Sequence, residues 1–362
     1  MRSDPCDAIA RQACQASSSR VVTAVGSRKG RIMTQTGETM SKSAPVPVQE
    51  MLRWYEQMCT IRAFEETAVD LFAKGLITGS THPCIAQEAI SVGACAALKS
   101  HDLVLATYRG HGVCIAKGAD PKVLMAELLG RVTGCSQGKG GSMHLVDVAH
   151  GILGTNAIVA AHIPIAGGVA LASKLRKTGQ VTLCFFGDGA SCEGEFFETL
   201  NMSALWKVPL VLICENNGYA ISVDTAKSQA TPDIADRAKG FGMPNAIVDG
   251  NDPLAVHQEV SRAVERARND EGPTLIECKT VRWERHSGFS AGHYEDPEAA
   301  QRWRIVDPLP RFRQFLLDEG VTEAEIGAAA QRASETIRAA VEFAQASPVP
   351  SEESIRSGIF AE

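Results

Sequence analysis

The chain has 362 residues, of which 44% are hydrophobic and 6% aromatic, with 32 glycines. This length and composition favour one large α/β domain with helical additions over a disordered or fibrous protein. The formal net charge of −6, from 36 basic and 42 acidic side chains, provides no broad positive surface. We therefore expect neither nucleic acid nor a membrane surface as a partner.

The cysteines and the apolar runs indicate the compartment. The chain has 11 cysteines, an odd number without any C-x-x-C pair. This distribution argues against a disulfide framework or a zinc site and favours reduced thiols packed as small apolar groups. No apolar run approaches the roughly 18 to 20 residues needed to span a bilayer. We expect a soluble, cytoplasmic protein.

The amino-terminal segment differs from the rest. Residues 1–46 are rich in Ser, Thr, Arg and Gln and show no apolar periodicity, so we predict a disordered extension before a folded domain over residues 47–362. Two alternatives stay open. The arginines could belong to an organelle transit peptide, although the acidic Asp4 and the missing amphipathic face count against it. The true start could also be Met33 or Met40.

Helices dominate the first part of the predicted domain. Apolar residues recur at three-, four- or seven-residue spacing over residues 47–75, which predicts one long amphipathic helix. A second helix is predicted over 86–98 and a short strand over 103–107. Another helix should begin after Pro121 and end at Gly130.

Two longer segments then lack clear periodicity. The first, 134–144, is rich in glycine, and the second comprises residues 151–161. Long loops inside compact domains are usually functional or disordered. We therefore expect both segments to wrap a ligand.

The remaining chain alternates strands and helices. Two strands are apolar nearly throughout, 181–186 and 210–214. Helices are predicted from about 164 and over 193–206, 234–239 and 253–268, and further strands are predicted near 246–248 and 274–279. The chain after residue 297 is predicted to be helical, with one helix over 323–345. Fully apolar strands that alternate with helices predict an α/β fold with a doubly wound, mostly parallel sheet.

Polar residues directly follow the two apolar strands. Asp188 lies between two glycines after the first strand, and Asn217 follows the second. Ligands of doubly wound sheets collect beyond the carboxyl ends of the strands, where both side chains could converge. Mg²⁺ prefers oxygen ligands and usually shares them with substrate phosphates. Asp188, Asn217 and one loop carbonyl would form such a site.

Each motif alone is weak evidence, because Asp-Gly and Asn-Gly are common turn sequences. Gly187-x-Gly189 is not a dinucleotide fingerprint, since Cys192 stands where a third glycine belongs. Gly138-Lys139 is not a P-loop, since Gly140 replaces the Ser or Thr that would contact magnesium. A nicotinamide dehydrogenase is therefore disfavoured.

Together, the motifs are specific. Gly187-Asp188-Gly189-Ala190, Glu193-Gly194, Asn201 and Glu215-Asn216-Asn217 resemble the thiamine diphosphate signature. From about residue 62 to 308 the chain resembles the alpha subunits of pyruvate and acetoin dehydrogenases, the decarboxylating component of 2-oxo acid dehydrogenase complexes. Further segments that carry this resemblance are Gln87-Glu88-Ala89, Tyr108-Arg109-Gly110-His111-Gly112, Gly138-Lys139-Gly140-Gly141-Ser142-Met143-His144, Asn201-Met202-Ser203-Ala204-Leu205-Trp206 and Arg285-His286-Ser287.

The resemblance implies the thiamine diphosphate-binding fold, with magnesium bridging the protein and the diphosphate. It implies that Asp188, Asn217 and the carbonyl of Tyr219 hold the metal. Gly189 and Ala190 would offer backbone N–H groups at the start of a helix, where the dipole favours an anion.

Other matching positions would contact the rest of the cofactor. Tyr108 and Arg109 resemble the family's pair that hydrogen-bonds the diphosphate, a task that suits a planar guanidinium. Ala157 and Val159 match positions that contact the aminopyrimidine, although a glycine is common in place of Ala157. His286 matches the loop histidine beside the diphosphate and the reacting carbon.

Histidine is the expected proton carrier near neutral pH. Besides His286, the resemblance places His82 near the substrate, although an ordinary solvated loop histidine is an equal alternative for His82. Glu284 and Arg285 replace the family's usual small lead-in to His286.

The resemblance also implies an incomplete site. The carboxylate that activates the aminopyrimidine comes from a separate beta subunit in the family, and we assign no such glutamate in this chain. We therefore expect an α2β2 oxidoreductase that decarboxylates pyruvate or cleaves acetoin and transfers the acyl group to lipoyl-lysine of an acyltransferase component. A branched-chain 2-oxo acid dehydrogenase is an alternative. A non-catalytic subunit that binds a phosphate ligand is another, which the pair of Asp188 and Asn217 disfavours.

Overall fold

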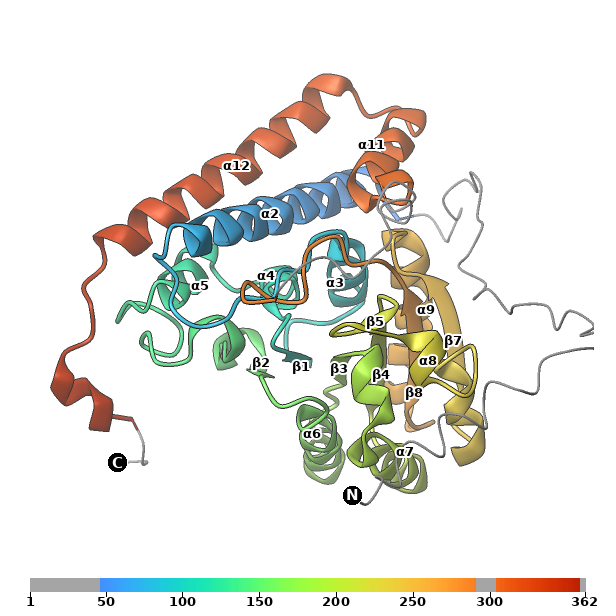
Figure 1. Ribbon diagram of the computed structural model, residues 1–362. Coiled ribbons are helices and arrows are strands. Elements are labelled where there is room, and N and C mark those ends of the chain that lie inside the picture. The colour runs from blue at the N-terminus through green and yellow to red at the C-terminus, as the bar shows by residue number, and fades with distance from the viewer. Residues whose placement is uncertain (1–45, 291–303, 359–362) are drawn as a thin grey trace, which may run out of the picture. The chain divides into compact units, whose positions relative to one another are not determined.

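The computed structural model describes residues 46–290 and 304–358. The predicted extension over residues 1–46 lies outside this part of the chain except for its last residue. The centre of the described residues is a six-stranded parallel sheet with helices on both faces (Figure 1). The strands lie in the order β2 (Ile152–Asn156), β1 (Leu103–Thr107), β3 (Thr182–Gly187), β4 (Leu210–Asn216), β8 (Thr274–Lys279) and β7 (Asn245–Asp249). The predicted doubly wound parallel sheet is confirmed.

The two faces of the sheet are covered by different helices. Along β3, Leu183 and Phe185 pack into one apolar cluster, and Cys184 and Phe186 into another, because successive strand residues point to opposite faces. The first cluster contains α2 (Val48–Ala73), α3 (Glu88–Ala96), α4 (His111–Lys117), α5 (Pro121–Leu128) and α9 (Pro253–Arg268). The second contains α6 (His162–Arg176), α7 (Gly194–Trp206) and the 3-10 helix η4 (Ala235–Phe241).

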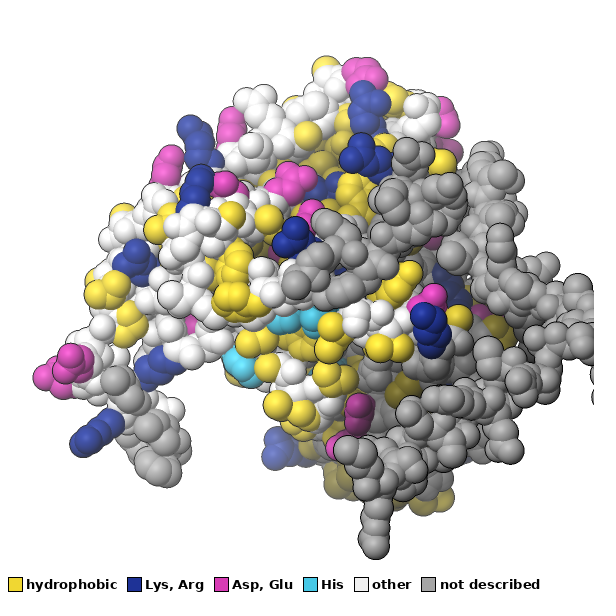
Figure 2. Space-filling model, in the orientation of Figure 1, with side chains coloured by type: hydrophobic (Ala, Val, Ile, Leu, Met, Phe, Trp, Pro, Cys, Tyr) yellow, Lys and Arg dark blue, Asp and Glu magenta, His cyan; other side chains and the backbone are white. Residues whose placement is uncertain are grey.

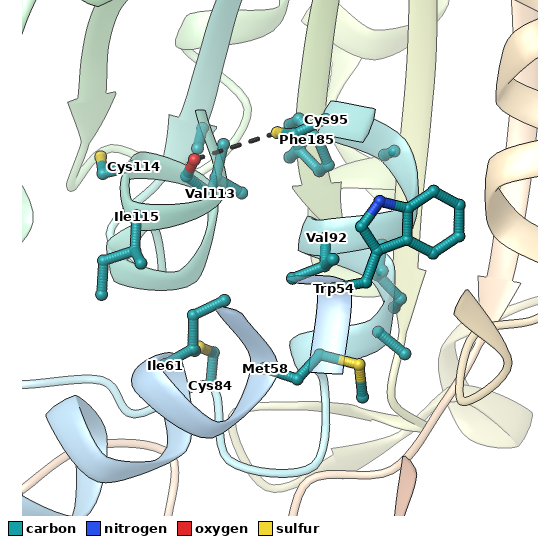
Figure 3. Packing of buried hydrophobic residues seen from close by; sticks show 14 of the residues in the cluster. Trp54, Met58, Ile61, Cys84, Val92, Cys95, Val113, Cys114, Ile115 and Phe185 are labelled. Carbon is teal, nitrogen blue, oxygen red and sulfur yellow. Dashed lines mark hydrogen bonds between the residues drawn. The ribbon is translucent and has the colours of Figure 1, made fainter. Parts of the chain in front are cut away.

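The carboxyl-terminal helices α11 (Pro308–Asp318) and α12 (Glu323–Ala346) add an outer layer. Helix α12 runs beside α2 (Figure 1), and both α11 and α12 contact it. The first turn of α12 is stabilised by a capping box between Thr322 and Glu325. In the layer beneath, Met58 and Ile61 of α2 belong to one apolar cluster with Val92 of α3 and the sheet residue Phe185 (Figure 3). These contacts hold α3 between α2 and the sheet.

Among the strands of the six-stranded sheet and the helices that cover it, two elements were not predicted, α4 and β2. Helix α4 is short and begins directly after Gly110, so it offers little periodicity. Strand β2 lies at the edge of the sheet and contains Gly154, Thr155 and Asn156, so it lacks an apolar run. Its pairing with β1 depends on backbone hydrogen bonds rather than on side-chain pattern.

The glycine-rich segment folds around a side chain of the protein itself. Glu127, in α5, is fully buried, and its carboxylate accepts four backbone N–H groups. Ser136 and Gly138 donate to one oxygen at 2.8 and 2.9 Å, and Gly140 and Gly141 donate to the other at 2.8 and 3.0 Å. The segment therefore surrounds the Glu127 carboxylate, and its expected contact with a ligand stays a prediction.

The smaller elements lie mostly in connections. They are the antiparallel pair β5 (Tyr219–Ala220) and β6 (Val223–Asp224), helix α8 (Thr225–Ser228), and the 3-10 helices η1 (Gly141–Met143), η2 (Val148–His150), η3 (Asp188–Cys192) and η5 (Glu352–Arg356). Across residues 46–290 and 304–358, no helix is both long and apolar enough to cross a bilayer. The nine cysteines of these ranges are free thiols.

Candidate functional site

A cavity of about 210 Å³ lies beyond the carboxyl ends of the central strands. The chain passes from β1 to β2 on one side and then to β3 on the other, so the winding direction switches between β1 and β3. Ligands of doubly wound sheets bind at such a point. Nine of the eleven predicted site residues line the cavity: Tyr108, Arg109, Val159, Asp188, Gly189, Ala190, Asn217, Tyr219 and His286.

Asp188 begins η3 directly after β3. Its side chain is buried, and Oδ2 has no hydrogen-bond partner among the described residues. Burial raises the pKa of this carboxyl to about 6, and the charge of Arg282 opposes the rise. An isolated buried carboxylate is unfavourable unless a cation compensates it. The next residue must be glycine, since a Cβ at Gly189 would lie 2.9 Å from the Cβ of Ala220.

A tight turn after β4 presents Asn217. Asn216 anchors this turn, because its amide donates to Glu277 at 2.7 Å and its Oδ1 accepts the N–H of Gly218 at 3.1 Å. Gly218 has φ +88°, a conformation that favours glycine. The Oδ1 of Asn217 accepts the N–H of Tyr219 at 3.3 Å. The turn therefore brings an amide and a backbone carbonyl to the same cavity as Asp188.

This group is not a cluster of conventional metal-binding side chains. Within the described ranges, no three His, Cys, Asp or Glu residues are placed to hold a metal ion. Asp188, Asn217 and Tyr219 offer one carboxylate, one amide and one backbone carbonyl. Such an oxygen set fits Mg²⁺, which takes further oxygens from phosphates and water.

Arg109 connects two loops at the cavity wall. The side chain is buried, and its guanidinium donates to the carbonyl of Pro83 and, at 3.2 Å, to the carbonyl of His286. The N–H of Gly288 also donates to the carbonyl of Thr81 at 3.0 Å. The loops that carry the two predicted catalytic histidines are therefore attached to each other.

The two histidines pack with Tyr108. The ring centroid of His82 lies 4.3 Å from that of Tyr108 and 5.1 Å from that of His286. Burial and the nearby Arg109 lower the pKa of His82 to about 3 and that of His286 to about 4. Both imidazoles are therefore neutral at pH 7 and can each accept or donate one proton. His82 does not itself line the cavity.

The two predicted aminopyrimidine contacts and two further histidines occupy separate places in the structure. Val159 lies at the mouth of the cavity and is 42% exposed, whereas Ala157 is not brought to the cavity wall. His162, which had no assigned role, is buried and its Nε2 lies 2.8 Å from the carbonyl oxygen of Phe185, so it supports β3. His144 is exposed.

Sequence reasoning assigned no site role to several residues of the cavity wall, although four of them (Gln87, Gly187, Glu193 and Glu215) stand in the motifs quoted above. These residues are Gln87, Thr107, Gly187, Glu193, Glu215, Ala220, Ile221 and Arg282. Glu215 is buried, and burial raises its pKa to about 7 against the opposing charge of Arg109. Arg282 follows β8 by three positions, and its place beyond a parallel strand is the signal that could have identified it.

A buried network of hydrogen bonds connects two loops near the site. His111 is fully buried, with Nδ1 3.0 Å from Oε2 of Glu65 and Nε2 2.9 Å from Oγ of Ser142. Glu65 also accepts the N–H of Cys84 at 3.1 Å. Cys84 lies two positions after His82, and Ser142 lies in the glycine-rich segment. His111 therefore links the glycine-rich segment to the loop of His82.

Known proteins are similar to this chain over most of its length. A family model described as the dehydrogenase E1 component matches residues 56–353. The chain is 42% identical over 315 residues to the alpha subunit of acetoin:2,6-dichlorophenolindophenol oxidoreductase of Bacillus subtilis, covering 86% of this chain and 94% of that protein. It is 39% identical over 313 residues to the pyruvate dehydrogenase E1 component subunit alpha of Zymomonas mobilis, covering 86% and 88%. The chain therefore belongs to the dehydrogenase E1 component family.

Proposed function

We propose that this chain is the alpha subunit of a thiamine diphosphate-dependent dehydrogenase that decarboxylates pyruvate or cleaves acetoin. The acyl group would pass to lipoyl-lysine of an acyltransferase component, which makes the enzyme an oxidoreductase with a disulfide acceptor. Relatives named for both activities cover most of the chain, and the family is thiamine diphosphate-dependent. The observation that carries the proposal is the buried Asp188 carboxylate, with an unpartnered oxygen, at the switch point of the sheet.

The cavity wall fits magnesium and a diphosphate. Asp188, Asn217 and the carbonyl of Tyr219 would hold the metal, since their oxygens share one cavity and one oxygen of Asp188 lacks a hydrogen bond among the described residues. The backbone N–H groups of Gly189 and Ala190 would face the diphosphate at the start of η3. Backbone amides at the start of a helical turn attract anions.

Other residues of this chain would orient the substrate and move protons. When bound, thiamine diphosphate supplies a thiazolium carbon that adds to the substrate carbonyl and accepts the electron pair released on decarboxylation. His286, neutral at pH 7, could donate a proton to the substrate oxygen, with His82 beside it. Arg109 would hold both histidine loops in place while it faces the cavity.

The remaining half of the site would come from a beta subunit in an α2β2 assembly. Helices α6 and α7 carry exposed apolar side chains, with Leu175 73%, Leu205 70% and Ile165 52% exposed. Figure 2 shows hydrophobic side chains beside histidine side chains on the face it presents. Large exposed apolar groups that lie on neighbouring helices are typical of a protein interface. The glutamate that activates the aminopyrimidine would then belong to the beta subunit.

The proposal is tested by reconstitution. The alpha chain, the beta chain and their mixture are assayed for reduction of an artificial electron acceptor with pyruvate, acetoin and a branched 2-oxo acid. We expect activity only in the mixture and only with magnesium and thiamine diphosphate. Activity without thiamine diphosphate would refute the proposal, and the substrate with the highest kcat/KM identifies the enzyme.

A further inference from the structure

Arg282 is one of the largest fully buried side chains of the described residues. Its guanidinium donates to the carbonyl of Tyr219 at 3.2 Å and to the carbonyl of Ile221 at 2.8 Å. The two carbonyls lie two positions apart in the hairpin formed by β5 and β6. One rigid, planar group thus holds the hairpin at two points, a geometry that suits arginine and not lysine.

The hairpin needs such support because it is short and strained. Its two strands pair only Tyr219 with Asp224 and Ala220 with Val223. Ile221 has φ +54°, in the left-handed region that a β-branched residue rarely adopts. A residue held there costs about 1–3 kcal/mol and persists only where its surroundings enforce it. The hydrogen bond from Arg282 to the carbonyl of Ile221 is such an enforcing contact.

The same arginine lies close to the metal site considered above. It lines the cavity with Asp188, Tyr219 and Ile221, and its charge opposes the rise in the pKa of Asp188. The carbonyl it contacts at Tyr219 is the third oxygen of the proposed metal site. Groups that hydrogen-bond to metal ligands orient those ligands and alter metal affinity.

We propose that Arg282 is a positioning residue that fixes the hairpin over residues 219–224 before any ligand binds, and so aims the Tyr219 carbonyl at the metal. This inference rests on the proposed function for the identity of the ligand. The claim that Arg282 holds the hairpin without a ligand does not depend on the proposed function. Two rival roles make different predictions: a purely electrostatic partner of Asp188 needs only a positive charge, and a purely structural residue would affect the whole domain.

The experiment compares Arg282→Lys and Arg282→Met in the full alpha chain assembled with its beta subunit. Lysine keeps the charge but cannot span both carbonyls, and methionine keeps only the bulk. Mn²⁺ in place of magnesium is followed by electron paramagnetic resonance with thiamine diphosphate present. We expect both variants to bind Mn²⁺ roughly 10- to 100-fold more weakly than the wild type.

Hydrogen exchange without ligands gives a second, independent measurement. We expect faster exchange over residues 219–224 in both variants and unchanged exchange in α9. The matched control is Arg268→Met, which removes a partly buried ion pair with Asp102, the residue before β1, at the amino ends of the strands. This control should lower thermal stability but leave Mn²⁺ affinity and hairpin exchange unchanged.

The outcomes separate the two proposals. If the wild-type complex binds neither Mn²⁺ nor thiamine diphosphate, the proposed function fails, while the exchange data still test the hairpin. If the wild type binds both and Arg282→Lys matches it in affinity and exchange, the positioning role is overturned. Global loss of folding in both variants would also overturn it, because the role assigned to Arg282 is local.

Discussion

The Glu127 carboxylate should control the order of the glycine-rich segment, and Glu127→Gln tests this with almost no change in volume. The substitution replaces one carboxylate oxygen by an NH₂ group, which cannot accept a hydrogen bond. Two of the four backbone N–H groups that now point to Glu127 then lose their acceptor. Because the Glu127 side chain is fully buried, water does not readily replace the lost oxygen.

The expected magnitude follows from the hydrogen bonds. A bond to a charged acceptor contributes about 1.5–3 kcal/mol, so the loss of two should destabilise the closed segment by about 3 kcal/mol or more. At about 1.4 kcal/mol per factor of ten, the local opening constant should rise at least roughly 100-fold. The lost negative charge adds to this effect, since all four N–H dipoles point at it.

Hydrogen exchange read at the amides of Ser136, Gly138, Gly140 and Gly141 measures the opening directly. We expect these amides to lose protection by that factor while the amides of β3 and β4 keep theirs. The control is Glu335→Gln on the exposed face of α12, which should change nothing in this segment. Unchanged exchange at all four amides in Glu127→Gln would show that the carboxylate does not hold the segment.

Three further predictions concern the cavity and its walls. Asp188→Ala should abolish calorimetric binding of thiamine diphosphate with magnesium without lowering the melting temperature, because it removes a buried charge; unchanged affinity would exclude Asp188 from the site. The pKa of His82 is about 3 in the folded protein, against about 6.5 unfolded, so the unfolded chain binds more protons and stability falls as the pH drops below 6.5. Between pH 6.5 and 5, the free energy of unfolding of His82→Phe in urea should therefore fall by about 2 kcal/mol less than that of the wild type. The same pH dependence in both proteins would contradict the low pKa of His82. Gly110→Ala should lower both the melting temperature and cofactor affinity, because the new Cβ would lie 2.4 Å from Cγ2 of Thr155; a wild-type melting curve would argue against this close packing.

The regular parts of the fold were predictable because their signals are local. The strands over 103–107 and 274–279 and the helix over 253–268 match the predicted bounds. Helix α9 has a proline at its first position and an aspartate cap, Asp252, that accepts the N–H of Leu254 at 2.9 Å. Such termini are encoded by neighbouring residues. Strand β2 was missed because its pairing partners in β1, such as Val104 for Ile152, lie far earlier in the chain and because its own side chains are both polar and apolar.

The candidate site was predictable where a motif follows a strand, as with Asp188 and Asn217. It was not predictable where the contact is non-local. Arg282 reaches Tyr219 and Ile221 from a loop some 60 residues further along the chain, and no sequence pattern relates them. The contact of the glycine-rich segment with Glu127 was missed for the same reason, since Glu127 belongs to the preceding helix. The roles of the predicted cofactor residues stay predictions.

The buried contacts of His111 have a consequence for how the site opens. Its imidazole touches Ser142 on one side and Glu65 on the other, and Glu65 in turn holds the backbone beside His82. Loss of either contact leaves a buried polar group without its partner, which neither loop can compensate alone. The glycine-rich segment and the His82 loop should therefore open as one cooperative unit, so that local unfolding at one is sensed at the other.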